Sequence, residues 1–415
     1  MPRWQNQSRL FGCRPTRILT PQSSTAVGTV VAEAAAAQTP VRMVGAGTVQ
    51  GDVAVSSGVL LRADALTDLQ WVEADVVRVG AGVSLAKLEA DLHRSGRAIA
   101  GLAGPSDATV AGTVSTSGYG FRVPLNCTVR ALELVTADGD VRWYSADTDI
   151  ARAAMGGIGA FGIITALELH TVPAYWNHVT STTLTFDDAA QNWRDWVQDS
   201  AWLQWWWVPG SQRVLVWRAG PAVANMPPTA AALPTPTEPR WRRRVGLAVP
   251  LLLPRLNRTA VLGAAADLAA PWSAGVRGPD ARAVSTTWTV PLDQALPALR
   301  ILRESLRGAA QTTTTALIVR AIDADTGLLS PFRDRRSALI SARVRLPAPF
   351  ERYFRAVTDA LAPFDARPHL ASYLPQTPQS PLGDHPGVAA ARELRAALDP
   401  SGLFDSAAVA RLLGS

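Results

Sequence analysis

The chain of 415 residues is longer than one ordinary hydrophobic core, so two domains are expected. Its hydrophobic content of 47% and charged content of 18% are those of a folded globular protein. The net charge of +6 would suit a nucleic-acid partner, yet the arginines are scattered among acids and no recognition motif is present. We therefore expect no nucleic-acid partner. Lys87 is the only lysine, which excludes Schiff-base chemistry at any other position.

Cysteine usage and the N-terminal sequence bear on location. Cys13 and Cys127 are too few for a metal cluster or a disulfide framework, so we expect reduced thiols, a cytoplasmic protein and no metal site. The N-terminal residues lead into polar sequence without the apolar segment of a signal peptide. No run of eighteen apolar residues is present that would span a membrane.

Up to Pro173 the chain alternates helical and strand-like patterns. Ser84 is a typical N-cap for a helix that stops at Gly96. Helices are predicted at 22–37 and 85–95, and strands at 41–44, 76–79, 131–136 and 162–170, with shorter apolar runs at 53–55 and 59–61. This is an α+β pattern.

After Pro173 strands and helices continue to alternate. Strands are predicted at 180–186, 214–218, 285–290 and 317–321, and helices at 188–199, 295–306, 348–361 and 387–398. Residues 221–239 are rich in proline and alanine and are predicted to form a loop.

Two segments of this half allow a structural and a functional interpretation. The tryptophan run at 202–209 fits a sugar-stacking platform, but a strand whose rings pack in the core is the simpler interpretation. The basic stretch 240–244, followed by 245–253, would suit peripheral contact with a membrane. Pro250 and Pro254 break that apolar run, which favours a solvated loop.

Residues 41–52, with the sequence VRMVGAGTVQGD, join a strand to a glycine-rich turn. Successive backbone N–H groups in such a turn can point at one anion and form a nest for a phosphate. Gly45 and Gly47 allow dihedrals that a Cβ would forbid, and they let a ligand approach closely. An ordinary turn is the simpler explanation of the segment alone, so its meaning depends on the rest of the chain.

Two further segments supply that context. Residues 104–120 are small and hydroxylated, too polar for a core strand and too ordered for a linker. Such a stretch is expected of backbone that lies along an extended polar ligand. Residues 156–165, GGIGAFGIIT, lead into the last predicted strand before Pro173.

In this order and spacing, the three segments resemble the FAD-binding domain of the vanillyl-alcohol-oxidase superfamily. The most similar branch contains alditol oxidase, gulonolactone oxidase and arabinono-lactone oxidase. Residues 109–120 correspond to its "TVAGxxSTxxxG" stretch and 156–165 to its "GxxGxxGIIT" stretch. In the second half, Arg367-Pro368-His369 resembles the active-site strand of the family, and 399–404 resembles its "DPxGxF" stretch.

This resemblance implies an α+β flavoprotein of two domains. A PCMH-type FAD-binding domain is expected in residues 1–176, and an α/β cap domain with an antiparallel sheet and the substrate site in 177–364. Residues 365–415 would form a C-terminal segment with the active-site strand and the closing helices. FAD contacts are implied for Gly45, Ala46, Gly47, Thr48, Val49, Gln50, Ser106, Thr109, Gly112, Thr113, Thr116, Ile163 and Ile164.

The first loop departs from the family at the site of covalent flavin attachment. Family members commonly carry a histidine followed by a serine there, and the histidine bonds to the flavin. Thr48 and Val49 stand at these positions. A threonine hydroxyl is a poor nucleophile without an activating base. We therefore expect non-covalent FAD, with the hydroxyl of Thr48 facing a phosphate.

The reacting centre departs from the family as well. The Glu-x-Arg of the family's cap strand is Ile318-Val319-Arg320 here, and the family's lysine aligns with Ser372. Hydride transfer from a carbinol needs a proton acceptor and positive charge that steadies the developing oxyanion. Arg320 is expected to supply the charge. His369 is a candidate for the acceptor, and a purely structural imidazole fits the sequence equally well.

The predicted function is FAD-dependent oxidation of an alcohol carbon in a small-molecule substrate, namely a sugar lactone, a polyol or a larger related alcohol. Ile318 removes a charge from the expected pocket and favours a larger or more apolar substrate. The departures also fit a homologue that binds FAD but has lost redox turnover, or a non-redox enzyme on the same fold. No motif specifies the substrate, the electron acceptor or the oligomeric state.

Overall fold

The computed structural model describes residues 2–102, 106–175, 177, 179–220, 283–306, 317–375 and 380–414. The predicted loop at 221–239, the basic stretch 240–244 and the apolar run 245–253 lie outside the described residues.

The N-terminal part contains a parallel sheet of three strands and an antiparallel sheet of five. The parallel sheet has the order β3–β5–β4, with strands at Arg17–Leu19, Val59–Arg62 and Val41–Val44. The antiparallel sheet has the order β10–β9–β11–β7–β6, with strands at Val141–Ser145, Val129–Val135, Ile163–His170, Val76–Gly80 and Leu69–Glu73. Two short pairs are β1 (Trp4–Gln5) with β2 (Gly12–Cys13), and β8 (Arg97–Ala98) with β12 (Val172–Pro173).

Helices α1 (Ser24–Ala36), α2 (Leu85–Arg94), α3 (Val110–Ser115) and α4 (Asp149–Ala154) belong to this part. The predicted helices at 22–37 and 85–95 are confirmed. Ser84 caps α2 as expected, because its hydroxyl oxygen accepts a hydrogen bond from the backbone N–H of Lys87 at 3.2 Å.

Within 104–120, where the sequence predicts backbone that lies along an extended polar ligand, the chain forms helix α3. Its N-cap is Thr109, whose hydroxyl oxygen accepts from the backbone N–H of Gly112 at 3.2 Å. Val110, Ala111 and Val114 are buried and occupy one side of the helix. The spacing of these three apolar residues is therefore helical, and the polar residues between them face the opposite side.

The second half forms a seven-stranded antiparallel sheet, here called the cap sheet, as the sequence predicts. Its order is β13–β15–β14–β17–β18–β16–β19. The strands lie at Val179–Thr185, Arg213–Ala219, Trp202–Trp207, Leu317–Ile322, Ser337–Arg345, Ala283–Pro291 and Arg367–Pro368. Helices α5 (Phe186–Asp199), α8 (Ala295–Ser305) and α9 (Glu351–Leu361) pack on one face of it.

The tryptophan run forms strand β14, and its rings divide between the two faces of the cap sheet. Trp205 and Trp207 pack edge to face against Phe186 of α5. Their burial confirms the core interpretation for this face. Trp202 and Trp206 lie on the opposite face, in a cluster with Leu215, Trp217, Ala219 and Phe121.

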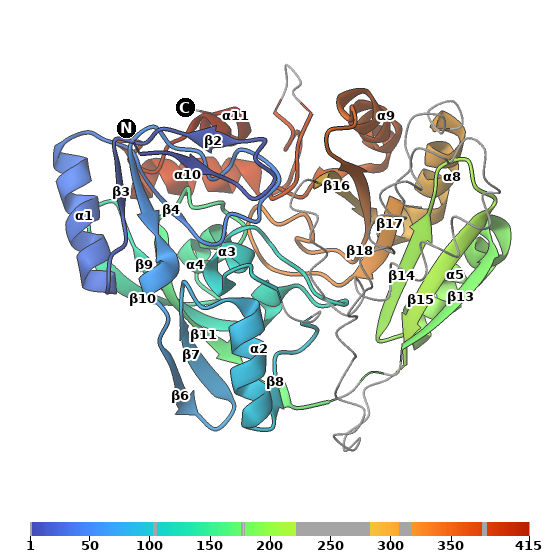
Figure 1. The fold of residues 1–415 in the computed structure, drawn as a ribbon, viewed down its shortest axis with the longest axis horizontal. Helices are drawn as coiled ribbons and strands as arrows, with labels where there is room; N and C mark the ends of the chain where they lie inside the picture. The colour runs from blue at the N-terminus through green and yellow to red at the C-terminus, as the bar shows by residue number, and fades with distance from the viewer. Residues whose placement is uncertain are drawn as a thin grey trace.

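The C-terminal segment crosses back to the N-terminal part. After β19, helices α10 (Val388–Leu398) and α11 (Ala407–Leu413) pack on the segment that includes Ile158 and Phe161. Figure 1 shows these helices, drawn in red, lying beside the first strands of the chain. The C-terminal segment, Val53 and the middle of the N-terminal part therefore share one core cluster.

Polar contacts fix the cap sheet to the N-terminal part. The guanidinium of Arg122 donates from Nε to both carboxylate oxygens of Asp323 at 3.0 and 2.9 Å. Asn126 donates its amide N–H to the buried carboxylate of Asp325 at 3.1 Å. These contacts hold Tyr119 and the residues around it against strands β17 and β18, where it packs with Ile322, Phe332 and Leu339.

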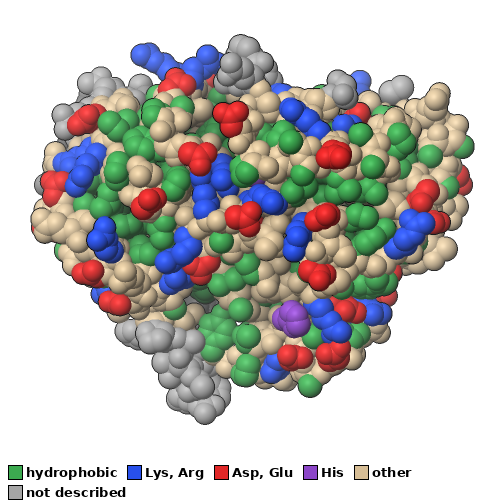
Figure 2. All heavy atoms as spheres, turned by 180° about the vertical axis from the view of Figure 1, so that it is seen from behind, with side chains coloured by type: hydrophobic (Ala, Val, Ile, Leu, Met, Phe, Trp, Pro, Cys, Tyr) green, Lys and Arg blue, Asp and Glu red, His purple; other side chains and the backbone are tan. Residues whose placement is uncertain are grey.

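Basic side chains lie among acidic ones on the face shown in Figure 2. No described helix is long and apolar enough to cross a membrane, and the described residues hold no cluster of metal-ligating side chains.

Candidate active site

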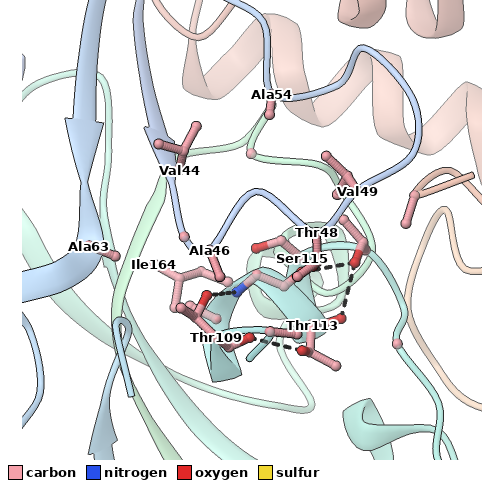
Figure 3. Close-up of a pocket in the computed structure, with 18 of the residues that line it drawn as sticks. Val44, Ala46, Thr48, Val49, Ala54, Ala63, Thr109, Thr113, Ser115 and Ile164 are labelled. Carbon is pink, nitrogen blue, oxygen red and sulfur yellow. Dashed lines mark hydrogen bonds between the residues drawn. The ribbon is translucent and has the colours of Figure 1, made fainter. Parts of the chain in front are cut away.

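A cavity of about 330 Å³ lies where the three glycine-rich segments meet. In Figure 3 the loop from Val44 to Val49 runs opposite helix α3, and Ile164 from β11 lies beside both. Most of the residues predicted to bind the cofactor line this one cavity. They are Gly45, Ala46, Gly47, Thr48, Val49, Ser106, Thr109, Gly112, Thr113, Thr116, Ile163 and Ile164.

Of the other predicted residues, His369 lines the cavity, whereas Gln50, Ser372 and Arg320 do not. The backbone N–H of Gln50 donates to the carbonyl of Ala371 at 2.7 Å. The hydroxyl of Ser372 is buried; it donates to the carbonyl of His369 at 2.7 Å and accepts from the backbone N–H of Thr287 at 3.1 Å. These contacts support the backbone that carries His369.

The glycines are required by close approach and by the backbone. A Cβ on Gly45 would lie 2.1 Å from Oγ1 of Thr109, so the first loop packs directly on the cap of α3. Gly47 has φ +67°, in the left-handed region that favours glycine. A Cβ on Gly112 would meet only Oγ1 of Thr109, at 2.8 Å, with nothing else within 4 Å. Its open side therefore faces the cavity.

The electrostatics of the cavity suit an anionic ligand. Its described lining contains no Asp or Glu and includes the guanidinium of Arg42. This side chain is 4% exposed and is fixed by donation to the carbonyls of Ile158 (2.6 Å) and Phe404 (3.0 Å) and to Oγ of Ser406 (3.3 Å). Burial lowers the pKa of Arg42 to about 10, which leaves it charged at neutral pH. The lining therefore fits the diphosphate of FAD.

Two backbone carbonyls that accept hydrogen bonds from site side chains belong to residues with strained, positive φ angles. Ile158, whose carbonyl accepts from Arg42, has φ +50°. Ser117, whose carbonyl is bonded by the ring of His369, has φ +52°. Such dihedrals are unfavourable for residues with a Cβ, above all for a β-branched one, and they persist where the surrounding structure enforces them. Both carbonyls are thereby turned toward a site side chain.

Tyr119 and His369 line the cavity on the side that contacts the cap sheet. Their rings meet edge to face with centroids 5.3 Å apart. Burial raises the pKa of Tyr119, so its phenol is a hydrogen-bond donor at neutral pH. Burial lowers the pKa of His369 to about 4, so the imidazole is neutral. Nε2 of that ring donates to the carbonyl of Ser117 at 3.1 Å, which leaves Nδ1 as an acceptor.

Arg320 lies beside this pair rather than in the cavity wall. Its guanidinium is 5.6 Å from the centroid of the Tyr119 ring. Nε donates to Oε1 of Gln204 at 2.5 Å and Nη1 to the carbonyl of Gly120 at 3.3 Å. The predicted catalytic residues Arg320 and His369 therefore both contact one tyrosine.

Sequence reasoning missed Arg42 and Tyr119. A signal exists for each: Arg42 is the one charged residue of a buried strand that runs straight into the glycine loop. Tyr119 is an aromatic residue between two glycines in a segment of small residues.

The comparisons with known proteins cover the whole chain. The sequence matches the FAD-binding-domain family over residues 15–145, and the D-arabinono-1,4-lactone oxidase family over residues 167–244 and 280–412, about half of the chain. L-gulono-1,4-lactone dehydrogenase of Mycobacterium tuberculosis is 26% identical over 435 residues, which cover 100% of this chain and 99% of that protein. Alditol oxidase of a Streptomyces species is 29% identical and covers 86% of each chain. A solvent-stable cholesterol oxidase has the same fold, with a TM-score of 0.77 at 14% identity over 100% of this chain and 97% of that one.

Proposed function

Because the chain belongs to the D-arabinono-1,4-lactone oxidase family, we propose that its cavity holds FAD without a covalent bond and that the reacting alcohol binds beside Tyr119 and His369. The protein is an FAD-dependent oxidoreductase that acts on CH–OH groups. The observation that carries the proposal is the meeting of three glycine-rich segments, an arginine and two hydrogen-bonding rings in one cavity.

The cofactor would be held by the loop from Gly45 to Val49 and by helix α3, with Arg42 adding positive charge toward the diphosphate. When bound, FAD supplies the two-electron acceptor for the hydride of the alcohol carbon. The residues of the chain supply everything else that the reaction needs, namely binding, orientation and a place for the proton.

Nδ1 of His369 is the acceptor for the substrate hydroxyl in this proposal. The donation from Nε2 to Ser117 fixes the tautomer and the orientation of the ring. An imidazole with its pKa lowered to about 4 is a weak base, so the hydroxyl proton moves only as the hydride leaves and the hydroxyl becomes acidic. The Tyr119 phenol donates a hydrogen bond to the substrate, and Arg320 adds positive charge beside that ring.

We also propose the domain limits that the sequence suggests, with residues 1–176 for the cofactor, 177–364 for the substrate and 365–415 closing the site. The passage of His369 into the cavity from the segment after β19 supports the last of these. A cytoplasmic location stays a prediction.

Non-covalent attachment is supported by the lining of the cavity. Neither Cys13 nor Cys127 lies in it. Partial desolvation of the thiol and the nearby carboxylates of Asp325 and Asp323 raise the pKa of Cys127 to about 12, which disfavours the nucleophilic thiolate. Thr48 stands at the position where the family attaches flavin. Acid precipitation of the purified yellow protein should therefore release the flavin into the supernatant. Fluorescence that stays with the denatured polypeptide would contradict the proposal, and peptide mapping would then identify the attached residue.

A further inference from the structure

We propose that the substrate carries a carboxylate that Arg320 binds, and that the preferred substrates are 2-hydroxy acids with an apolar side chain. This inference rests on the proposed function, because it names the substrate class of the same site. It starts from the charge of Arg320 and from the residues that share its face of the cap sheet.

The charge of Arg320 has no acidic counterpart in the part of the chain that the structure describes. Its partners are an amide oxygen of Gln204, the carbonyl of Gly120 and the ring of Tyr119, all of them neutral. Burial lowers the pKa of Arg320, and among the described residues Tyr119 is the titratable group that acts on it electrostatically. A guanidinium still keeps its proton at neutral pH.

Several other partly buried arginines are paired with carboxylates. Arg122 contacts Asp323 at 2.9 Å, Arg78 contacts Glu168 at 2.6 Å and Arg411 contacts Asp52 at 2.7 Å. Taking a charge out of water without a counterion is costly. An anion delivered by the substrate would remove that cost.

The hydrogen-bonding capacity of Arg320 fits a carboxylate. A guanidinium has five N–H groups, and the described residues engage one on Nε and one on Nη1. The remaining donors include both of Nη2. A carboxylate accepts such N–H groups in pairs, which gives strong and directional binding.

The neighbouring row of the cap sheet is largely apolar. Ile318 lies two residues before Arg320 on the same face of β17 and is likewise only partly buried. Its cross-strand neighbours are Trp206 on β14 and Ser341 on β18. Trp206 in turn packs with the cluster of Trp202, Leu215 and Trp217. A substrate whose carboxylate meets Arg320 would lay an apolar side chain on this row.

His369 and Arg320 contact the same tyrosine ring. The His369 ring lies 5.3 Å and the guanidinium 5.6 Å from the centroid of the same Tyr119 ring. A 2-hydroxy acid carries its hydroxyl on the carbon beside the carboxylate, so both groups must be bound close together. Oxidation removes a hydride from that carbon, with flavin as the acceptor, and a proton from the hydroxyl, and yields a 2-oxo acid.

The test compares acids with their uncharged amides on the FAD-loaded protein. Flavin bleaching is followed without oxygen for 3-phenyllactate and 2-hydroxy-4-methylpentanoate, for their amides, and for a polyol and a lactone. The acids should reduce the flavin with an efficiency about 100-fold or more above that of the amides, as expected for one partner of a desolvated charge pair. Arg320→Met should abolish this preference.

Arg218→Met is the matched control, because Arg218 belongs to the same sheet but lies on the ring of Trp196 in α5, at 5.0 Å. It should keep the preference for acids.

The outcomes separate this inference from the proposed function. Should the amides, the polyol or the lactone reduce the flavin as well as the acids do, the carboxylate site is wrong and the oxidoreductase stands. If no compound reduces the flavin, the result contradicts the proposed function, and the carboxylate site is then tested by ligand binding alone. Phenylpyruvate should then change the flavin absorption spectrum of the wild-type protein and leave that of Arg320→Met unchanged. The same spectral change in both proteins, or no change in either, would overturn the carboxylate site.

Discussion

Arg42 and Arg320 both bring positive charge to the site, but their surroundings assign them different tasks. Arg42 is held by three oxygen acceptors from Ile158, Phe404 and Ser406, so its position is fixed before any ligand arrives. Its Nε is buried without a partner. Arg320 keeps donors available beside the reacting groups. The first arrangement suits a resident cofactor, and the second suits a substrate that must enter and leave.

Arg42→Met is expected to weaken FAD binding about 10- to 100-fold, the scale of one hydrogen bond to a charged group. The measurement is the flavin-to-protein absorbance ratio followed by titration of the apoprotein with FAD. Riboflavin, which has no diphosphate, serves as the control ligand and should bind wild type and variant alike. An equal loss for both ligands would mean that Arg42 acts only as a structural clamp, through Ile158 and Phe404.

Among single residues, the sequence predicts those that matter because they are small or leave the backbone accessible. It misses those whose role depends on contacts with distant parts of the chain. Gly45 and Thr109 stand in recognisable motifs, and the cavity brings them together. Tyr119 and Arg42 belong to no motif. Their roles depend on contacts with residues more than 100 positions away in the chain, such as Arg320 and Ile158. Ser372 was singled out from the sequence, but its hydroxyl forms hydrogen bonds with backbone groups and does not line the cavity.

Helix α3 is the element on which the cofactor site depends most directly. It is only six residues long, and its polar side faces the cavity while Val110 and Val114 anchor it in the core. The hydroxyls of Thr113 and Thr116 donate to backbone carbonyls one turn earlier, at 2.8 Å each. The helix therefore presents a smooth wall of methyl groups and backbone at Gly112.

Gly112→Leu should fill the cavity and yield a folded protein without flavin. The reason is that a Cβ here meets only Oγ1 of Thr109, so a larger side chain extends into the space that the cofactor needs. Absorbance at purification and the thermal melting of the apoprotein measure the two effects separately. Gly96→Asn is the control: Gly96 has φ +67° with nothing within 4 Å of an added Cβ, and asparagine tolerates that backbone. A fully yellow Gly112→Leu protein would remove α3 from the cofactor site.

Elements with a clear period were predicted well, whereas strands β6, β10 and β18 and helices α4 and α11 were not predicted. Strand β4 and helix α2 carry local signals, a buried apolar run and a capped amphipathic helix. Strand β18, Ser337–Arg345, was not predicted because small residues and Arg343 interrupt its alternation. It is nevertheless central, since it pairs with both β16 and β17. The sheet neighbours, rather than the strand's own sequence, determine its structure.

The whole molecule is joined by buried polar groups between the cap sheet and the N-terminal part. The carboxylate of Asp325 accepts from Asn126 (3.1 Å), from the hydroxyl of Ser330 (2.8 Å) and from the backbone of Gly327 (3.2 Å). His385 is bonded to the carbonyl of Ser330 through Nε2 at 2.9 Å. The C-terminal segment, the loop after β17 and the N-terminal part thus meet in one network, close to the strand that carries His369.

This network makes the pH dependence of folding a property of the whole molecule. Burial lowers the pKa of His369 and of His385 to about 4, below the ordinary 6.5, so their contribution to stability is present above pH 6.5 and is lost as pH falls through 4. Burial raises the pKa of Asp325 to about 6 from 3.8, so its contribution has the opposite sign: it is present below 3.8 and lost as pH rises through 6. Among these three groups, two against one give the unfolded chain about one extra proton between pH 4 and 6, and the raised pKa of Glu89 offsets part of it.

We therefore expect the free energy of unfolding to fall by roughly 1 kcal/mol per pH unit as the pH is lowered from 6 to 4. Denaturant titrations at several pH values measure this slope. His385→Asn removes one titrating group and should flatten the slope, whereas Asp325→Asn removes the opposing group and should steepen it. The exposed His170 is the control, since His170→Asn leaves the buried network intact and should not change the slope. If Asp325→Asn and His385→Asn shift the slope in the same direction, the two groups do not oppose each other and the network does not determine the acid stability of the protein.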